Sequence, residues 1–424
     1  MLQVPFIREN RDQVIQGLAK RNKDFTTQID AIITLDETRR KTQNDLDNML
    51  AEVNKLSKEI GEMMKSGRKD DAEKIKPQVA SLKEQIKTLE TTLAETEEAQ
   101  KQLLYQIPNV PNEIVPVGKT ADENVEVYRW GSVPTLGENK KPHWELIEEY
   151  DLIDFELGTK ITGAGFPVYK GKGARLQRAL INFFLDEATA AGYREFQPPL
   201  MVNEASGYGT GQLPDKEGQM YHVGVDDLYL IPTAEVPLTN LYRDVILKES
   251  DLPVKMTGYT PCFRREAGSW GAHVRGLNRL HQFDKVEIVQ LVHPDQSYAI
   301  LENMVEHVKQ LLQKLGLHFR IIRLCGGDMG FTSSLTYDFE AWSGAQERWL
   351  EVSSTSNFET FQANRLKCRF KNADGKTQLV HTLNGSALAL PRIVASLLEN
   401  NQDANGIKIP EALVPYTGFD RISK

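Results

Sequence analysis

Residues from about 27 to 105 carry the pattern that most constrains how this chain can fold. The region has one proline and few glycines, and two series of mostly apolar residues recur in it at alternating spacings of three and four. The first series is Leu35, Thr42, Leu46, Met49, Val53, Leu56, Ile60 and Met63. The second series is Ile75, Val79, Leu82, Ile86, Leu89, Leu93 and Leu103. The pattern predicts two long helices that pack along a shared apolar seam.

The polar segment 65–70 lies between the two series and predicts a tight connection, so the helices should pair as an antiparallel hairpin. An arm of ~35–40 residues per helix would reach roughly 50–60 Å. Pro77 is expected close to the start of the second helix, where its missing N–H is harmless. Such an arm is either a structural spacer or dimerisation rod, or a lever that contacts a large partner.

Three basic clusters on the arm are candidates for phosphate contacts, although charge runs of this kind are usually solvated faces. They are Arg39-Arg40-Lys41, Lys55 with Lys58, and Arg68-Lys69. The net charge of −8 argues against indiscriminate binding of nucleic acid.

The rest of the chain predicts a second domain of a different class. Prolines punctuate a linker at 108–134, which separates an N-terminal domain (1–107, arm at about 27–105) from a domain at 135–424. That domain opens with an amphipathic helix at 174–191. Strand-like runs follow at 228–231, 255–265, 281–291, 318–324, 348–353, 366–370 and 378–383. Many of these runs are consecutive, so we expect an α+β domain on a mostly antiparallel sheet flanked by helices, and not a Rossmann fold.

Composition narrows the cellular setting. No apolar run approaches the ~20 residues that span a bilayer, and the first ten residues lack a signal-peptide core. Cys262, Cys325 and Cys368 are scattered without a paired spacing. The sequence therefore predicts a cytoplasmic protein without a membrane partner, a disulfide framework or a cysteine-based zinc site.

The segments 263–268 and 281–287 are the most informative for chemistry, because they place a guanidinium and several carboxylates on strands joined by a glycine-rich loop. Arg264 suits a phosphate, since its planar fork makes bidentate contacts and stays protonated. The alternative is a salt bridge between Arg264 and Glu266. A site that holds nucleotide phosphates beside the ammonium group of an amino acid needs groups of this kind.

These motifs resemble those of class II aminoacyl-tRNA synthetases, and closely those of bacterial-type seryl-tRNA synthetases, over essentially the whole chain. The helix 174–191 with Pro198-Pro199 resembles motif 1, at the dimer interface of the family. Segment 263–287 resembles motif 2, and segment 385–392 resembles motif 3. Thr233-Ala234-Glu235 is similar to the serine-binding element of the family.

The resemblance implies a homodimeric ligase that uses ATP and Mg²⁺ to convert L-serine into seryl-adenylate. It then transfers serine to the 3′ end of tRNA(Ser), and in this family also of tRNA(Sec), with the arm holding the tRNA. Serine's carboxylate is already ionised, so positioning and charge stabilisation must supply the catalysis. Two alternatives stay open: a ligase that loads a carrier protein, against which the heptads count, and a non-catalytic protein with a degenerate domain.

The resemblance also implies a set of site residues, with catalytic roles on Arg264 and Arg392. The ATP-binding residues are Arg264, Arg265, Glu266, Leu280, His281, Gln282, Phe283, Glu351, Val352, Ser353, Ser354 and Arg392. The serine-binding residues are Thr233, Ala234, Glu235, Arg264, Glu287, Asn384 and Ser386. Glu351 and Ser354 would hold Mg²⁺ with the phosphates.

Simpler interpretations exist for some of these residues. Phe283 is equally compatible with core packing, and the region of Glu351 and Ser354 with an ordinary strand end. His273 and His281 are interpreted as structural, because this chemistry gives them no required role. Two departures from the family are Arg265, where many relatives carry serine, and segment 357–360, which replaces a more usual Asn-Cys-x-Asp.

Overall fold

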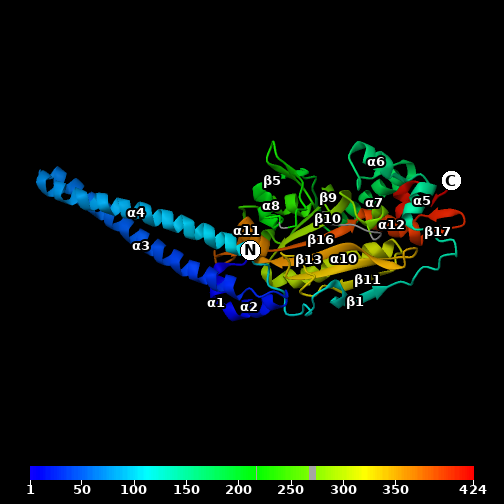
Figure 1. Cartoon of the computed structure of the whole chain (residues 1–424), viewed down its shortest axis with the longest axis horizontal. Coiled ribbons are helices and arrows are strands. Elements are labelled where there is room, and N and C mark those ends of the chain that lie inside the picture. The colour runs from blue at the N-terminus through cyan, green and yellow to red at the C-terminus, as the bar shows by residue number, and fades with distance from the viewer. Residues whose placement is uncertain (216, 267–273) are drawn as a thin grey trace. The chain divides into compact units, whose positions relative to one another are not determined.

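A computed structural model of the chain describes residues 1–215, 217–266 and 274–424 and divides it into two compact units (Figure 1). The helical unit comprises residues 2–19 and 23–108. The sheet unit comprises residues 1, 20–22 and 109–424. The predicted α+β class is confirmed by the long helices of the first unit and the antiparallel sheet of the second.

The helical unit confirms the predicted hairpin. Two short helices, α1 (Val4–Glu9) and α2 (Arg11–Ala19), precede α3 (Thr26–Lys65) and α4 (Lys69–Leu104). We call the paired α3 and α4 the arm. Gly67 turns the chain between them with φ +81°, and the N–H of Arg68 closes the turn on the carbonyl of Met63 at 2.9 Å. The alternating apolar residues pack against one another along the arm, with Leu46, Val53, Val79 and Ile86 buried.

The seam differs from the prediction near the open end of the hairpin, where it continues through polar residues. Asp36, Thr96 and Gln100 are buried, and the seam ends on Leu104 while Leu103 is only half-buried. Each polar group has a partner that makes its burial tolerable. Asp36 accepts hydrogen bonds from Arg8 at 2.5 Å and Arg39 at 3.2 Å, and Gln100 donates to the carbonyl of Ile32 at 3.3 Å. A prediction based on the spacing of apolar residues cannot detect these buried positions, because their residues are polar.

The expectation for Pro77 was wrong. Pro77 is the ninth residue of α4 and lies inside the helix, beyond the first turn in which the backbone N–H groups have no helical acceptor. Its ring therefore removes the hydrogen bond that would reach the carbonyl of Glu73. The long flanking seam holds the helix together across this position.

The sheet unit is built on a mostly antiparallel sheet with the order β1-β11-β12-β13-β16-β10-β9-β4 among the described residues (Figure 1). Its strands are β1 (Val125–Trp130), β4 (Arg194–Glu195), β9 (Val254–Phe263), β10 (Gln282–Val292), β11 (Phe319–Arg323), β12 (Leu335–Ser343), β13 (Arg348–Glu359) and β16 (His381–Ala389). Within the described part of this sheet, the short β4 is the one strand that pairs in parallel, with β9.

The remaining elements surround this sheet. The helices are α5 (His143–Glu149), α6 (Phe155–Ile161), α7 (Gly171–Ala190), α8 (Glu204–Thr210), α9 (Glu235–Asn240), α10 (Ser297–Lys314), α11 (Thr360–Leu366), α12 (Leu390–Asn400) and α13 (Val414–Thr417). The smaller sheets contain β2 (Ile153–Asp154), β3 (Val168–Tyr169), β5 (Met201–Asn203), β6 (His222–Val223), β7 (Leu228–Leu230), β8 (Ile246–Lys248), β14 (Arg369–Lys371), β15 (Thr377–Leu379), β17 (Gln402–Asp403), β18 (Gly406–Lys408) and β19 (Arg421–Ile422).

Several sequence expectations need correction. The stretch predicted as a linker, 108–134, contains β1, which pairs with β11 at the edge of the sheet. Strand β12 was not predicted at all, although its residues alternate between apolar and polar. The run predicted as a strand at 366–370 instead begins with the end of α11, and Lys367 leaves that helix in the left-handed region with φ +53°.

Strand β10 divides the core into two clusters on opposite faces of the sheet. Val286 and Ile288 belong to a cluster that includes side chains of α7, α10 and α12. Val289 and Leu291 belong to a second cluster, with residues of α9 and α11. Because side chains alternate along a strand, Glu287 lies on the same face as Val289. No helix in the described part of the chain has both the length and the apolar character needed to cross a membrane.

Replacement of Pro77 by alanine should stabilise the arm. The change restores a backbone hydrogen bond in an exposed helix interior, so we expect the free energy of unfolding of the helical unit to rise by roughly 1–3 kcal/mol. Urea titration followed by circular dichroism measures this. The neighbouring exposed substitution Gln78→Ala is the control and should change stability by only a few tenths of a kcal/mol. Equal midpoints for Pro77→Ala and the unmodified protein would contradict the account.

Candidate active site

Two buried carboxylates from different elements form the centre of the site. Glu235 begins α9, and Glu287 lies within β10. The amide nitrogen of Asn384, on β16, donates to both of them, at 2.9 Å to Glu235 and 3.0 Å to Glu287. Thr233 donates to Glu287 at 3.1 Å and accepts from the N–H of Glu235 at 3.2 Å. Four of the seven residues predicted to bind serine are thus brought into one hydrogen-bonded group.

Two further residues support this carboxylate pair and were missed by the sequence analysis. Lys285 pairs with Glu287 at 2.6 Å, and both side chains are buried. Gln362, on α11, donates to Glu235 at 2.6 Å and accepts from Thr382 at 2.7 Å. Lys285 stands two residues before Glu287 and could have been found by strand alternation. Gln362 could not, because no local pattern connects it with Glu235.

The burial of the carboxylate pair shifts the pKa values of both groups. Burial first, and the charge of Glu287 second, raise the pKa of Glu235 to about 7. Burial also raises the pKa of Glu287, although Lys285 and Thr233 counteract it. Two carboxylates this close favour a cation between them. The ammonium group of an amino acid would serve, and its binding would keep Glu235 ionised.

Arg264 lies immediately after β9, beside an aromatic ring. Its guanidinium carbon is 5.2 Å from the centre of the Phe283 ring, and its backbone N–H donates to the carbonyl of His281 at 2.9 Å. Its positive charge is felt by both buried carboxylates, where it lowers their pKa values. Arg264 does not pair with Glu266, which instead forms an ion pair with Arg279. The alternative of a local salt bridge is therefore wrong, and the Arg264 guanidinium has no ion-pair partner among the described residues.

The other residues of the predicted nucleotide segment separate into exposed and structural positions. Arg265 and Gln282 are exposed, whereas Leu280 is buried in the main core cluster. His281 stacks on Phe166 at 5.4 Å, and its Nδ1 is 2.8 Å from the hydroxyl of Tyr221. These contacts suit the structural role expected of His281. Ala267 and Gly268 of the motif, and His273, lie outside the described residues.

A β-bulge brings Glu351 and Ser354 to the same face of the sheet. Residues three apart on a regular strand point to opposite faces, but β13 contains one extra residue opposite β12. As a result Ser354 pairs with Asp338 and Glu351 pairs with Glu340, and these two partners are two apart on β12. The predicted metal ligands therefore share a face.

Asp338 strengthens the case for a cation at this place. The residue is half-buried, but its Oδ1 is inaccessible to solvent and has no hydrogen-bond partner among the described residues. Burial and the charge of Glu351 raise its pKa well above the ordinary range, while Ser354 lowers it. No group of three or more acidic, histidine or cysteine side chains in the described ranges is arranged to hold a metal alone. The residues fit an ion that takes its other ligands from phosphate oxygens.

Arg392, in the first turn of α12, is held at both ends of its guanidinium. Its Nε donates to the carbonyl of Asn278 at 3.0 Å, and Nη1 donates to the carbonyl of Glu351 at 2.9 Å. The carboxylate of Glu351 lies 3.6 Å from Nη1. The Nη2 group makes no hydrogen bond with the described residues and can bind an anion.

Strand pairing places these groups on one face of the sheet. Paired residues lie on the same face, and Glu287 pairs with Ser386, two residues from Asn384. Asn384 pairs with Ser356, two residues from Ser354. A second bulge, on β16, sets Ser386 and Ala389 opposite Glu287 and Lys285. Phe283 pairs with Cys262, two residues before Arg264. The side chains predicted for the amino acid, the adenine and the metal therefore share a face.

Three of the residues predicted to bind a substrate are buried in the structure. Ala234 and Val352 are fully or almost fully buried among apolar neighbours, and the buried Ser353 donates to the carbonyl of Ser386 at 2.6 Å. In the segment that departs from the family, Phe358 is buried and Glu359 is hydrogen-bonded to Tyr298. The departure is accommodated within the packing behind the site.

Comparisons with known proteins agree with this architecture. A family model described as the tRNA synthetase class II core domain (G, H, P, S and T) matches residues 221–401. The antiparallel sheet, with Arg264 directly after β9 and Arg392 on α12, is thus the core of a class II aminoacyl-tRNA synthetase. A second model, the seryl-tRNA synthetase N-terminal domain, matches residues 1–111.

Individual relatives match the chain from end to end. A serine–tRNA ligase of Salinibacter ruber is 50% identical and one of Akkermansia muciniphila is 48% identical, each covering 100% of this chain and 99% of the relative. The crystal structure of seryl-tRNA synthetase from Pyrococcus horikoshii complexed with ATP superposes with a TM-score of 0.92 at 34% identity, covering 100% of this chain and 99% of that one. The chain belongs to the serine–tRNA ligase family, as predicted, and hence to the aminoacyl-tRNA ligases.

The pKa of Glu235 predicts a pH dependence for amino acid binding. Protonated Glu235 cannot pair with an ammonium group, so affinity should be highest above pH 7 and fall as pH drops through about 7. Below the pKa, the KM for serine should rise by up to about tenfold per pH unit. The KM for serine is measured from initial rates of the serine-dependent reaction between pH 5.5 and 8.5 at saturating ATP. The KM for ATP over the same pH range is the control. A serine KM that is constant over this range would refute the role of Glu235.

Proposed function

We propose that this chain is a serine–tRNA ligase that acts in two steps. The carboxylate of L-serine attacks the α-phosphorus of ATP, forming seryl-adenylate and releasing diphosphate. A hydroxyl at the 3′ end of tRNA(Ser) then attacks the acyl carbon and releases AMP. The single observation that carries this proposal is the Glu235–Asn384–Glu287 group, an ammonium-binding arrangement that shares one sheet face with the residues suited to ATP.

The arrangement supports catalysis by position and charge. Arg264 would contact the serine carboxylate and the α-phosphate, since its fork has no competing partner at Glu266. Phe283 and Glu266 would hold the adenine, and Arg392 would bind the terminal phosphate with its Nη2 group. No residue needs to act as a general base, because the attacking carboxylate is already ionised. The rate then depends on aligning two reactants and stabilising charge on phosphorus.

Serine would be selected by hydrogen bonds to its hydroxyl group. The site offers Thr233, Asn384 and Glu235 as polar neighbours, all buried or half-buried. An amino acid without the hydroxyl would leave one of them unpaired, and a site of this kind rejects such analogues strongly.

Mg²⁺ would bind beside the phosphates, held by Glu351 and Ser354. Its role would be to neutralise phosphate charge and fix the geometry of the triphosphate. Asp338 would support it from the adjacent strand, since it pairs with Ser354 and its Oδ1 has no hydrogen-bond partner among the described residues. The cation would also relieve the repulsion between Asp338 and Glu351.

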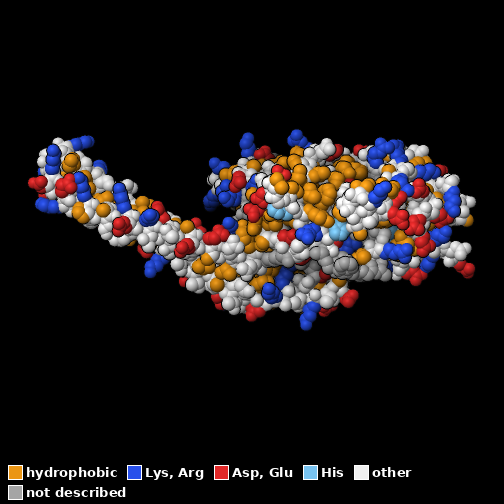
Figure 2. All heavy atoms as spheres, turned by 45° about the horizontal axis from the view of Figure 1, so that its top comes forward, with side chains coloured by type: hydrophobic (Ala, Val, Ile, Leu, Met, Phe, Trp, Pro, Cys, Tyr) orange, Lys and Arg blue, Asp and Glu red, His pale blue; other side chains and the backbone are white. Residues whose placement is uncertain are grey.

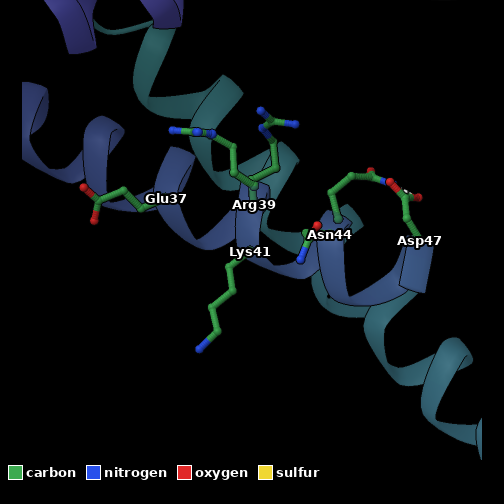
Figure 3. A pocket seen from close by; sticks show the side chains of 7 residues that line it. Glu37, Arg39, Lys41, Asn44 and Asp47 are labelled. Carbon is green, nitrogen blue, oxygen red and sulfur yellow. Dashed lines mark hydrogen bonds between the residues drawn. The ribbon is translucent and has the colours of Figure 1, made fainter. Parts of the chain in front are cut away.

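The arm is the proposed contact surface for the tRNA, and in the wider family also for tRNA(Sec). A surface pocket on α3 is lined by Glu37, Arg39, Arg40, Lys41, Gln43, Asn44 and Asp47. Arg39 and Lys41 extend from different sides of the helix (Figure 3). Arg40 and Lys41 are exposed and form no salt bridge with the described residues, so both charges are available to phosphate groups.

A homodimer in the cytoplasm is the proposed working form. Leu200 and Met201, which follow the motif 1 prolines, are among the exposed large hydrophobic residues. Hydrophobic side chains also gather on one face of the sheet unit (Figure 2). An exposed apolar surface of this kind marks an interface. The three cysteines are free and buried, which suits a reducing compartment.

Serine-dependent exchange of diphosphate into ATP tests the activation step. The unmodified protein should catalyse the exchange with serine, and alanine should be poorer by roughly 10⁴-fold in kcat/KM. Arg264→Lys keeps the charge but loses the fork, so we expect kcat to fall by about 10²–10³-fold. The exposed Arg68→Lys, on the arm, is the matched control and should stay within about threefold in the exchange reaction. Absence of exchange with serine would rule out the activation half of the proposal.

Charge reversal in the α3 pocket tests the role of the arm. Arg40→Glu with Lys41→Glu should raise the KM for tRNA(Ser) in charging by on the order of tenfold, because two phosphate contacts become repulsive. Diphosphate exchange should not change. Removal of a negative charge from the same pocket by Glu37→Gln should leave the tRNA KM unchanged or lower it. A double reversal that impairs exchange and charging equally would contradict the assignment.

A further inference from the structure

A fully buried carboxylate on α12 connects four elements behind the ATP side of the site. Glu399 Oε1 accepts from the N–H of His143 at 2.9 Å, from Nδ1 of His143 at 2.8 Å and from the amide of Gln346 at 2.9 Å. Its Oε2 accepts from the hydroxyl of Ser343 and from the N–H of Ala345 at 3.3 Å. The side chains of Glu399 and His143 are both inaccessible to solvent. The described mechanism uses none of these groups.

The hydrogen bonds around His143 fix its tautomer. Its Nε2 accepts from the backbone N–H of Leu277 at 2.9 Å, so this nitrogen carries no proton. Nδ1 must then carry the proton and donate it to Glu399. The pKa of Glu399 reflects this, because burial alone would raise it and the bonds from His143 and Ser343 outweigh burial and lower it. The imidazole therefore joins the Glu399 carboxylate to the backbone of Leu277 through two hydrogen bonds of fixed direction.

The receiving turn is η4 (Gly276–Asn278), and it is shaped to meet the imidazole. Gly276 has φ +66°, and a Cβ added to it would lie only 2.4 Å from Nε2 of His143. Gln346 reaches the same turn by a second route, since its side-chain oxygen accepts from the amide of Asn278 at 3.0 Å. Both routes from Glu399 thus end on adjacent residues of one short turn.

That turn carries the carbonyl that orients Arg392. The carbonyl of Asn278 accepts from Nε of Arg392 at 3.0 Å, and the second hold on the guanidinium is the carbonyl of Glu351. Arg392 lies on the same helix as Glu399, seven residues earlier in the chain. The helix α12 and the η4 turn are therefore connected at two points. One is the buried Glu399–His143–Leu277 chain of hydrogen bonds, and the other is the bond from Arg392 to Asn278 at the site.

We infer that Glu399 and His143 are positioning residues that hold the η4 turn so that Arg392 presents its free Nη2 edge to the terminal phosphate of ATP. The inference rests on the proposed function for the role of Arg392. An error of about 1 Å in such a group can cost on the order of 10²-fold in rate. The serine side of the site, at Glu235 and Glu287, is not connected to this relay by any hydrogen bond described above.

Two substitutions of His143 separate the relay from simple packing. His143→Asn keeps a donor for Glu399 but removes the acceptor for Leu277. His143→Gln places an amide oxygen where Nε2 was and keeps that acceptor. We expect His143→Asn to lower kcat/KM for ATP in diphosphate exchange by roughly 10–100-fold, with the serine KM within about twofold. His143→Gln should recover most of the loss.

A matched control makes the same chemical change elsewhere. His307 lies on α10, its ring is largely buried, and its Nε2 has no partner among the described residues. His307→Asn should leave the kinetic parameters for ATP unchanged. A second test combines His143→Asn with Arg392→Lys, which keeps the charge but loses the bond from Nε to Asn278. In that background the effect of His143→Asn on ATP should shrink to within about twofold, because coupled residues are not additive.

ATP affinity measured by calorimetric titration separates failure of this inference from failure of the proposed function. Lack of serine-dependent exchange by the unmodified protein would overturn the proposed function, while a weaker ATP Kd in His143→Asn would still support the relay. The relay is overturned by unchanged ATP parameters in His143→Asn, or by equal losses for ATP and serine together with a lowered melting temperature. An undiminished effect in the Arg392→Lys background would also overturn it.

Discussion

The pairing of strand β10 with β9 on one side and β16 on the other is the constraint on which the site depends. Val286 and Ile288 commit one face of β10 to the main core, and Val289 commits the other face to the second core. The register can therefore not slip by one residue without exchanging two apolar cores. The two cores therefore fix the position of Glu287 along β10. The pairing of β10 with β16 then fixes the positions of Asn384 and Ser386.

The site is a charge pattern that is incomplete without ligands. Glu235 and Glu287 share one buried place with Lys285 as their close cationic partner, while Asp338 and Glu351 repel each other nearby. Arg264 and Arg392 provide positive charge that nearby carboxylates do not fully neutralise. Burying charge in this way costs stability, because desolvation is only partly offset by the available partners. Substrates with an ammonium, a triphosphate and a divalent ion would supply the missing charges.

Periodicity was the reliable guide to the fold, and it failed where polar residues have distant partners. The heptads predicted the hairpin because Leu46 and its successors need an apolar partner along their whole length. They could not predict that Asp36 continues the seam, since its burial depends on Arg8, 28 residues earlier. Strand β12 was overlooked even though its alternation is regular. The prolines before β1 obscured a genuine edge strand.

The residues of the candidate site were predicted largely through motif resemblance. Glu235, Glu287, Arg264 and Arg392 stand in motifs with recognisable spacing, and the structure brings the first three together with Arg392 on the adjoining helix. Gln362, Asp338 and His143 escaped notice for a physical reason. Their roles arise from contacts across long separations, such as the 127 residues between Gln362 and Glu235, and a single sequence contains no trace of such contacts.

The bulges in β13 and β16 make chain length a functional property in its own right. Glu351 is aligned with Ser354, and Ser386 with Ala389, only because each strand contains one residue more than its neighbour requires. Loss of that extra residue would turn every later side chain of the strand to the opposite face of the sheet, and apolar groups would replace the oxygen atoms of the candidate site. In these two strands, deletion of one residue should therefore be more damaging than a conservative substitution outside the candidate site.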